Sequence, residues 1–162
     1  MIRGRIFKYG DDINTDVIFP GKYTYTVSDP KEMVKYAMED LDPTFKDEVK
    51  EGDVIVAGTN FGCGSSREQA ATCLKMSGIS VVIAKSFSRI YFRNAINNGM
   101  LAITCPEAVD LAKNGEIIEV DVERGIIIVD KKEVKFPPIP DSVSEILKSG
   151  GLVPYIKNKI KK

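Results

Sequence analysis

The residues best suited to chemistry stand together in one glycine-rich segment, residues 58–68, which reads GTNFGCGSSRE. The segment follows a short apolar run and precedes a stretch of helical periodicity at residues 66–76. Glycines let a ligand approach the backbone closely, and the first turn of a helix offers unpaired N–H groups to an anion. Arg67 adds a planar guanidinium that suits a carboxylate. The segment therefore predicts a site for a small anionic ligand.

An ordinary capped turn is the competing interpretation of this segment. Ser65 and Glu68 have the spacing of a capping box, which would place a plain helix start here. Other glycine motifs do not fit: a dinucleotide fingerprint requires glycine where Arg67 stands, and the Gly-Lys-Ser/Thr of a P-loop is absent. A hydrolase nucleophile elbow needs a glycine two residues after the serine, and a histidine. Neither Ser65 nor Ser66 has such a glycine, and the chain has no histidine.

Two further segments carry polar side chains that could take part in a site. Residues 10–16 read GDDINTD, and the glycine and glutamate that a calcium loop requires are missing, so the residues alone favour a surface turn. Residues 85–99 predict a helix whose apolar face belongs to the core. Cys63 lies in the glycine-rich segment, where a reactive thiol is conceivable, but a small buried side chain is the favoured interpretation.

The composition excludes several classes of protein. The 162 residues hold 23 basic and 23 acidic side chains, whereas nonspecific nucleic-acid binding needs a positive surface. Histidine is absent, which removes the usual base of serine hydrolases and a common zinc ligand. Three widely spaced cysteines fit reduced thiols. With no signal peptide and no apolar run near ~20 residues, we expect a cytoplasmic protein without membrane or nucleic-acid partners.

The elements that must position these residues alternate along the chain. Short apolar runs predict strands at residues 2–7, 54–57, 81–84 and 101–104. Helical spacing predicts helices at residues 30–41, 66–76, 88–97, 106–114 and in the tail 141–162. Strands separated by helices indicate a parallel sheet, while residues 117–121 and 126–129 predict an antiparallel hairpin. The sequence therefore predicts an α/β fold with a mixed sheet, in a single domain over residues 1–162.

Three motifs together resemble a known family. They are GDDINTDVIFPGKY at residues 10–23, GTNFGCGSSREQA at 58–70 and AKSFSRIYFRNAINNG at 84–99. In this order and at this spacing they resemble the small subunits of 3-isopropylmalate dehydratase, swivel domains related to the last domain of aconitase. The resemblance covers essentially the whole chain.

The resemblance implies a fold, a partner and a reaction. The fold would be a three-layer β/β/α swivelling domain with a mixed, largely parallel sheet. The partner would be the 3-isopropylmalate dehydratase large subunit, which carries a [4Fe–4S] cluster, so this chain would hold no cofactor and no metal; alone it could form a homo-oligomer. The complex would be a hydro-lyase that isomerises 2-isopropylmalate, a small hydroxy-dicarboxylate, to 3-isopropylmalate in leucine biosynthesis.

The resemblance also assigns roles to individual residues. Ser65 matches the base that removes the proton next to a carboxylate. A serine hydroxyl is a weak acid, so its alkoxide would need backbone N–H groups and Arg67 to stabilise it. The matching substrate-binding positions are Gly64, Ser66, Arg67, Thr15 and Asp16.

Substrate choice is assigned to a loop that follows the first motif. Relatives that act on a substrate with an extra carboxylate carry an arginine there, and Tyr25 stands at the matching place in this chain. An aromatic side chain suits a branched aliphatic group better than an anion, which favours isopropylmalate. Gln69 departs from the histidine of many relatives. A homoaconitase, a methylmalate or dimethylmalate hydro-lyase small subunit, and a non-catalytic anion-binding domain are the alternatives.

Overall fold

The computed structural model describes residues 1–161 and contains one seven-stranded sheet. Its strands are β1 (Ile2–Lys8), β2 (Val54–Ala57), β3 (Val81–Ala84), β4 (Leu101–Thr104), β5 (Ile117–Asp121), β6 (Ile126–Val129) and β7 (Lys132–Lys135). The order across the sheet is β4-β3-β2-β1-β5-β6-β7. Pairings from β4 to β1 are parallel, and those from β1 through β5 and β6 to β7 are antiparallel. The predicted strands, the hairpin and the mixed sheet are confirmed.

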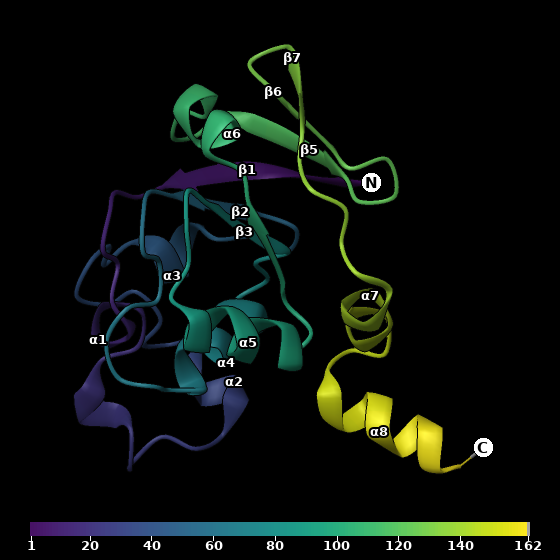
Figure 1. The fold of residues 1–162 in the computed structure, drawn as a ribbon. Helices are drawn as coiled ribbons and strands as arrows, with labels where there is room; N and C mark the ends of the chain where they lie inside the picture. The colour runs from purple at the N-terminus through teal and green to yellow at the C-terminus, as the bar shows by residue number, and fades with distance from the viewer. Residues whose placement is uncertain (162) are drawn as a thin grey trace.

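The parallel half of the sheet is covered on both faces, which explains its uninterrupted apolar strands. Ile55 and Val82 belong to one core cluster, whereas their neighbours Val54 and Val81 belong to a second cluster on the opposite face. The second cluster also takes residues from β5, β6 and β7, so the antiparallel half packs over the parallel half. Helices α4 and α5 lie on the other side (Figure 1). The three layers are the predicted β/β/α arrangement.

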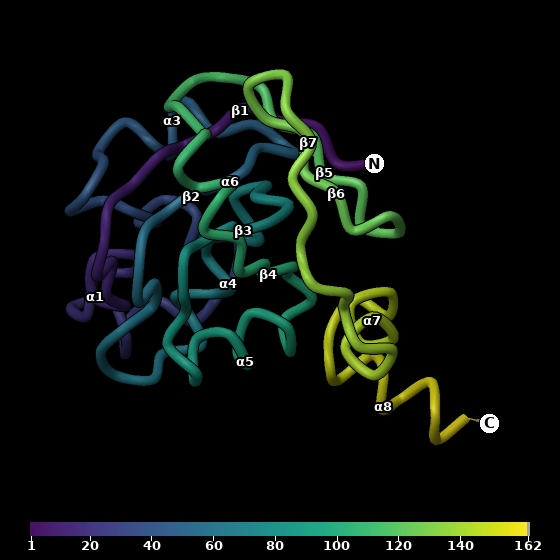
Figure 2. The backbone as a smooth tube through the Cα atoms, turned by 45° about the horizontal axis from the view of Figure 1, so that its top comes forward, coloured from purple at the N-terminus to yellow at the C-terminus, as the bar shows by residue number. Residues whose placement is uncertain are grey.

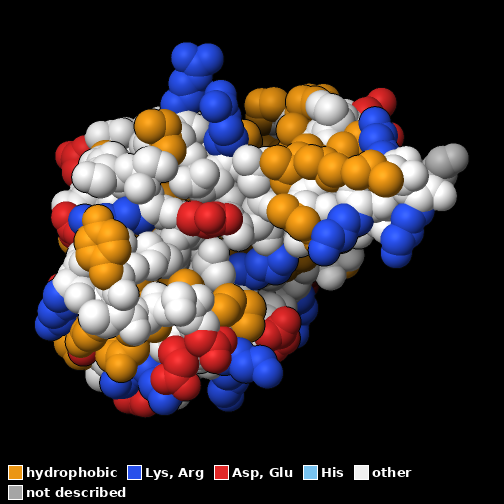
Figure 3. All heavy atoms as spheres, turned by 90° about the horizontal axis from the view of Figure 1, so that it is seen from below, with side chains coloured by type: hydrophobic (Ala, Val, Ile, Leu, Met, Phe, Trp, Pro, Cys, Tyr) orange, Lys and Arg blue, Asp and Glu red, His pale blue; other side chains and the backbone are white. Residues whose placement is uncertain are grey.

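The helices are mostly short. They are α1 (Thr15–Ile18), the 3-10 helix η1 (Gly21–Tyr23), α2 (Pro30–Met33), α3 (Phe45–Glu48), α4 (Gln69–Met76), α5 (Arg89–Asn97), α6 (Pro106–Leu111), α7 (Asp141–Lys148) and α8 (Leu152–Ile160). The last two stand beside the main body, at the C-terminal end of the chain (Figure 2). Along α8, the side chains of Val153, Ile156 and Ile160 form an exposed apolar row (Figure 3). No helix within residues 1–161 is long and apolar enough to cross a membrane.

The helix predicted at residues 30–41 is much shorter in the structure. Only α2 forms, and turns follow it. The backbone of Met38 adopts a positive φ of 60°, and its N–H donates to the carbonyl of Ile18 at 2.8 Å instead of to its own helix. Of the five apolar residues whose spacing suggests a helix, Met33, Ala37 and Met38 are buried nevertheless, while Val34 and Leu41 are not. Burial therefore produced the pattern without a continuous helix.

Candidate active site

The three motifs meet at the carboxyl ends of three adjacent parallel strands, β1, β2 and β3, because each motif follows one of these strands. The N–H of Gly62 donates to the carbonyl of Ile13 at 2.7 Å, which joins the first motif to the second. The N–H of Phe61 donates to the carbonyl of Ser86 at 3.0 Å, which joins the second to the third. The strand order reverses beside β1, where parallel pairing gives way to antiparallel pairing. Such reversals at the carboxyl ends of strands are where α/β folds bind ligands.

Two polar residues of the segment 10–16 hold the backbone of the loops around them. Asp11 accepts a hydrogen bond from the N–H of Thr59 at 2.7 Å, and Asn14 caps α1 by accepting from the N–H of Val17 at 3.0 Å. The surface-turn interpretation therefore holds for these two residues. Within residues 1–161, no cluster of His, Cys, Asp and Glu side chains is arranged to hold a metal ion.

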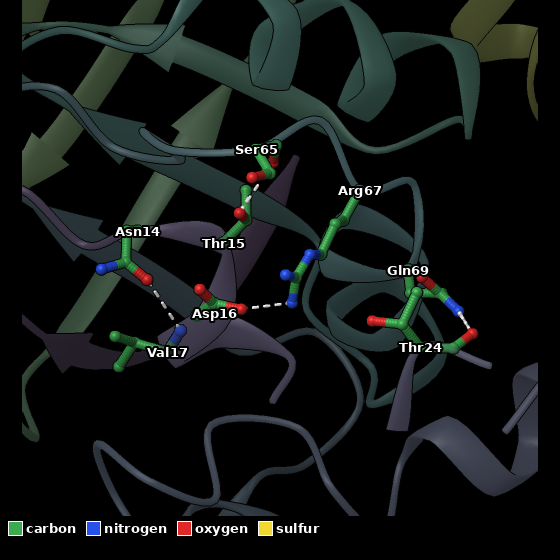
Figure 4. Close-up of polar contacts among 8 residues, drawn as sticks. All are labelled: Asn14, Thr15, Asp16, Val17, Thr24, Ser65, Arg67 and Gln69. Carbon is green, nitrogen blue, oxygen red and sulfur yellow. Dashed lines mark hydrogen bonds and ion pairs between the residues drawn. The ribbon is translucent and has the colours of Figure 1, made fainter. Parts of the chain in front are cut away.

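Ser65 is exposed, and its backbone is fixed from the first motif. The hydroxyl of Thr15 donates to the carbonyl oxygen of Ser65 at 2.8 Å (Figure 4). Thr15 itself is only 3% exposed, which is unusual for a polar side chain. A buried hydroxyl thus holds the loop while leaving the Ser65 side chain free at the surface.

The helix after the glycine-rich segment begins later than the sequence predicts. α4 starts at Gln69, and Glu68 at its N-cap accepts no side-chain capping bond, so the predicted capping box between Ser65 and Glu68 does not form. The backbone N–H groups of residues 64–68 donate to no other group in the part of the chain that the structure describes. Unpaired N–H groups in sequence can bind an anion. The candidate anion site is therefore a loop rather than a helix N-terminus.

Arg67 is held by a carboxylate from the first motif. One of its terminal nitrogens, Nη1, forms an ion pair with Oδ1 of Asp16 (Figure 4), and the Arg67 side chain is 20% exposed against 61% for Asp16. Gly21 lies against this pair so closely that a Cβ atom there would be 2.6 Å from Nη1. A guanidinium has five N–H donors, so the pair with Asp16 leaves donors for a ligand carboxylate.

These residues line a small surface pocket that is too narrow for a water molecule, so a ligand would sit at its mouth. The predicted residues in its lining are Thr15, Gly64, Ser65, Ser66 and Arg67. The lining also contains Gly62, Ile90, Tyr91 and Asn94, which the sequence did not single out as site residues. Ile90, Tyr91 and Asn94 lie on the helix predicted in the third motif, and their shared face was the feature of the sequence that could have identified them.

Tyr25 is the predicted substrate residue that the structure does not bring into this pocket. Its side chain is 98% exposed and is absent from the pocket lining. The preceding residue is tied to the site instead, because the side-chain amide of Gln69 donates from Nε2 to the carbonyl of Thr24 at 2.8 Å (Figure 4). Gln69 therefore connects α4 to the loop that carries Tyr25.

The cysteines do not form a cofactor site. Cys73 and Cys105 are buried, and Cys63 is half-buried beside the pocket; all three are free. Burial raises the pKa of the Cys73 thiol well above its usual value, which keeps it protonated. An iron–sulfur cluster needs several thiolates at one place. The described residues of this chain do not fit such a cluster.

Fold and site together define an α/β domain with a candidate anion-binding loop at the carboxyl ends of its parallel strands, and the model of the aconitase C-terminal domain family matches residues 7–108. A 3-isopropylmalate dehydratase small subunit from Caldanaerobacter subterraneus is 51% identical over 162 residues, covering 99% of this chain and 100% of the relative. One from Aquifex aeolicus is 52% identical, covering 98% and 95%. The chain belongs to the aconitase C-terminal domain family, among the 3-isopropylmalate dehydratase small subunits.

A solved structure agrees with this assignment. The crystal structure of a 3-isopropylmalate dehydratase from Methanocaldococcus jannaschii superposes with a TM-score of 0.92 at 47% sequence identity. The match covers 98% of this chain and 95% of that one. The swivel-domain fold that the motifs implied is therefore confirmed.

Proposed function

We propose that this chain works as the small subunit of a 3-isopropylmalate dehydratase and isomerises 2-isopropylmalate to 3-isopropylmalate in leucine biosynthesis. Its 162 residues would act as one swivel domain in the cytoplasm. The partner would be a large subunit that carries the [4Fe–4S] cluster. Relatives with this name that match over 95% and 100% of their length support the proposal.

The observation that carries the proposal is the placement of Ser65. Its side chain stands exposed among unpaired N–H groups, its backbone is fixed by Thr15, and an arginine oriented by Asp16 lies two residues away. Such a site can bind a carboxylate and hold an oxyanion at the same place. An exposed serine between two carboxylate-binding features is suited to act on the carbon next to that carboxylate.

Arg67 and the N–H groups of residues 64–68 would bind the substrate carboxylate and stabilise the charge that develops on it. The Ser65 alkoxide would take the proton from the carbon next to that carboxylate, and the same groups would lower the cost of forming the alkoxide. In the reverse direction the Ser65 hydroxyl would return this proton to carbon. Departure of the substrate hydroxyl would be the task of the large subunit.

The test is turnover of isopropylmalate by the complex co-expressed with its large subunit under anaerobic conditions. Ser65→Ala should lower kcat by more than ~100-fold, because loss of a general base typically costs ~100- to 10,000-fold. Ser142→Ala, at an exposed serine on α7 with no side-chain hydrogen bond among the described residues, should leave kcat unchanged. Full activity of Ser65→Ala would overturn the assigned mechanism, and a complex inactive on isopropylmalate would overturn the substrate.

A further inference from the structure

The loop of residues 20–27 touches the candidate site at two points. Gly21 lies against the ion pair between Arg67 and Asp16. Further along the loop, the carbonyl of Thr24 accepts the hydrogen bond from Gln69 at 2.8 Å (Figure 4). Among the described residues, this is the one hydrogen bond between the loop and the segment that carries Ser65, Arg67 and the start of α4.

Tyr23 anchors the loop to the turns that follow α2. The ring of Tyr23 stacks on Tyr36 with 4.0 Å between centroids, and its hydroxyl donates to Glu39 at 3.4 Å. Beyond Thr24 the chain emerges into solvent, and Tyr25 is 98% exposed. The carbonyl of Thr24 is thus the last group tied to the site before Tyr25, and this bond holds the backbone that carries the Tyr25 side chain.

We propose that Gln69 is a positioning residue that fixes Tyr25 relative to Arg67, and through it the choice among malate derivatives. Gln69 and Arg67 lie two residues apart on the same segment. The hydrogen bond to Thr24 therefore fixes the distance between the group that binds the substrate carboxylate and the aromatic ring that would face its variable substituent. The role rests on the function proposed above.

The experiment compares kcat and KM of the complex for 2-isopropylmalate and for a malate with a methyl substituent. Gln69→Leu is one atom shorter and has no donor, and Gln69→Glu keeps the length but has only acceptors at neutral pH. In both variants the preference for isopropylmalate should fall about three- to tenfold, as expected for one hydrogen bond, with the loss mainly in KM for isopropylmalate. Gln69→His keeps a ring N–H that can donate and should restore part of the preference.

Three further measurements separate positioning from a general weakening of α4. Thr72→Val removes a different side-chain donor from α4, one that binds Glu68 and Asn98, and should leave the preference unchanged. In the Tyr25→Ala background, Gln69→Leu should have no further effect on the preference, since the residue it positions is gone. Amide hydrogen exchange over residues 24–27 should become faster in Gln69→Leu but not in Thr72→Val.

Each outcome decides between the two proposals. An active complex whose preference is unchanged by Gln69→Leu and Gln69→Glu would overturn the role of Gln69 and leave the proposed function standing. The same follows if the effect of Gln69→Leu persists in full without the Tyr25 ring. A wild-type complex that acts on neither malate would overturn the proposed function, and the role of Gln69 with it.

Discussion

The hydroxyl of Thr15 donates to the backbone carbonyl of Ser65 at 2.8 Å, across 50 positions of the sequence. This bond joins the segment after β1 to the segment after β2, and it is made by a side chain that is 3% exposed. A carbonyl that starts a helix would accept a bond from within that helix. Thr15 binds this carbonyl where the chain forms a bend ahead of α4, and the N–H groups of residues 64–68 stay available to a ligand.

Thr15→Val removes this hydrogen bond while keeping the shape of the side chain. We expect the free energy of unfolding to fall by about 1 kcal/mol, the usual net worth of such a bond. The kcat/KM of the complex should fall about tenfold, since the Ser65 backbone is then held less firmly. Thr15→Ser keeps the hydroxyl and should stay nearer the wild type in urea unfolding and in kinetics. Equal losses in the two variants would contradict a role for the hydroxyl.

Arg67→Lys keeps the charge and removes the planar fork. The pair with Asp16 holds the guanidinium at the pocket, and an ammonium cannot bind both Asp16 and a substrate carboxylate in the same geometry. We expect KM to rise about 10- to 100-fold, corresponding to about 1.5–3 kcal/mol for hydrogen bonds to a charged group. Arg93→Lys, at an exposed position of α5, should leave KM unchanged. A loss confined to kcat would contradict the binding role.

The central strands could be predicted because a strand that is buried on both faces is a continuous run of apolar residues. Val54–Ala57 and Val81–Ala84 are apolar at every position, and each residue is buried in the structure. That the three motifs lie close together could also be predicted, because each follows a strand of the parallel part of the sheet. What could be predicted was therefore what depends on local pattern and on strand direction.

The start of α4 could not be predicted, because it depends on a contact between distant residues. Ser65 and Glu68 have the spacing of a capping box, yet no capping bond forms, and the carbonyl of Ser65 accepts a hydrogen bond from Thr15 instead. The link between Gln69 and Thr24 has the same character, since it joins residues 45 positions apart. Neither contact leaves a periodic pattern in the sequence.

Gly62→Ala should be among the most damaging substitutions of the site. Gly62 has a φ of +81°, and a Cβ atom there would be 2.1 Å from Cγ of the Tyr91 ring. Backbone strain and overpacking together should cost about 3 kcal/mol or more. Gly10→Ala is the matched control, since a Cβ at Gly10 meets nothing within 4 Å. Thermal unfolding of the two variants measures the difference, and similar midpoints would contradict the close packing of Gly62.

Tyr91 connects the pocket to α4 through a buried phenol. Its ring packs against Gly62, and its hydroxyl donates to the carbonyl of Ala70 at 3.0 Å. The side chain is 1% exposed, and this burial raises the pKa of the phenol well above its usual value. The folded protein therefore keeps the proton at a pH where the unfolded chain loses it.

In Tyr91→Phe, the free energy of unfolding should consequently fall less steeply at alkaline pH than in the wild type. Below about pH 10 the phenol of Tyr91 is protonated in both states, and the variant should be less stable by about 1 kcal/mol through the lost hydrogen bond. Above about pH 10 the phenol ionises only in the unfolded wild type, whose stability should fall by up to ~1.4 kcal/mol per pH unit more than that of the variant. The buried Cys73 thiol adds a similar slope to both proteins and cancels in the comparison. Urea unfolding between pH 8 and 11 should show the two stabilities converging, and a constant gap across this range would contradict the raised pKa.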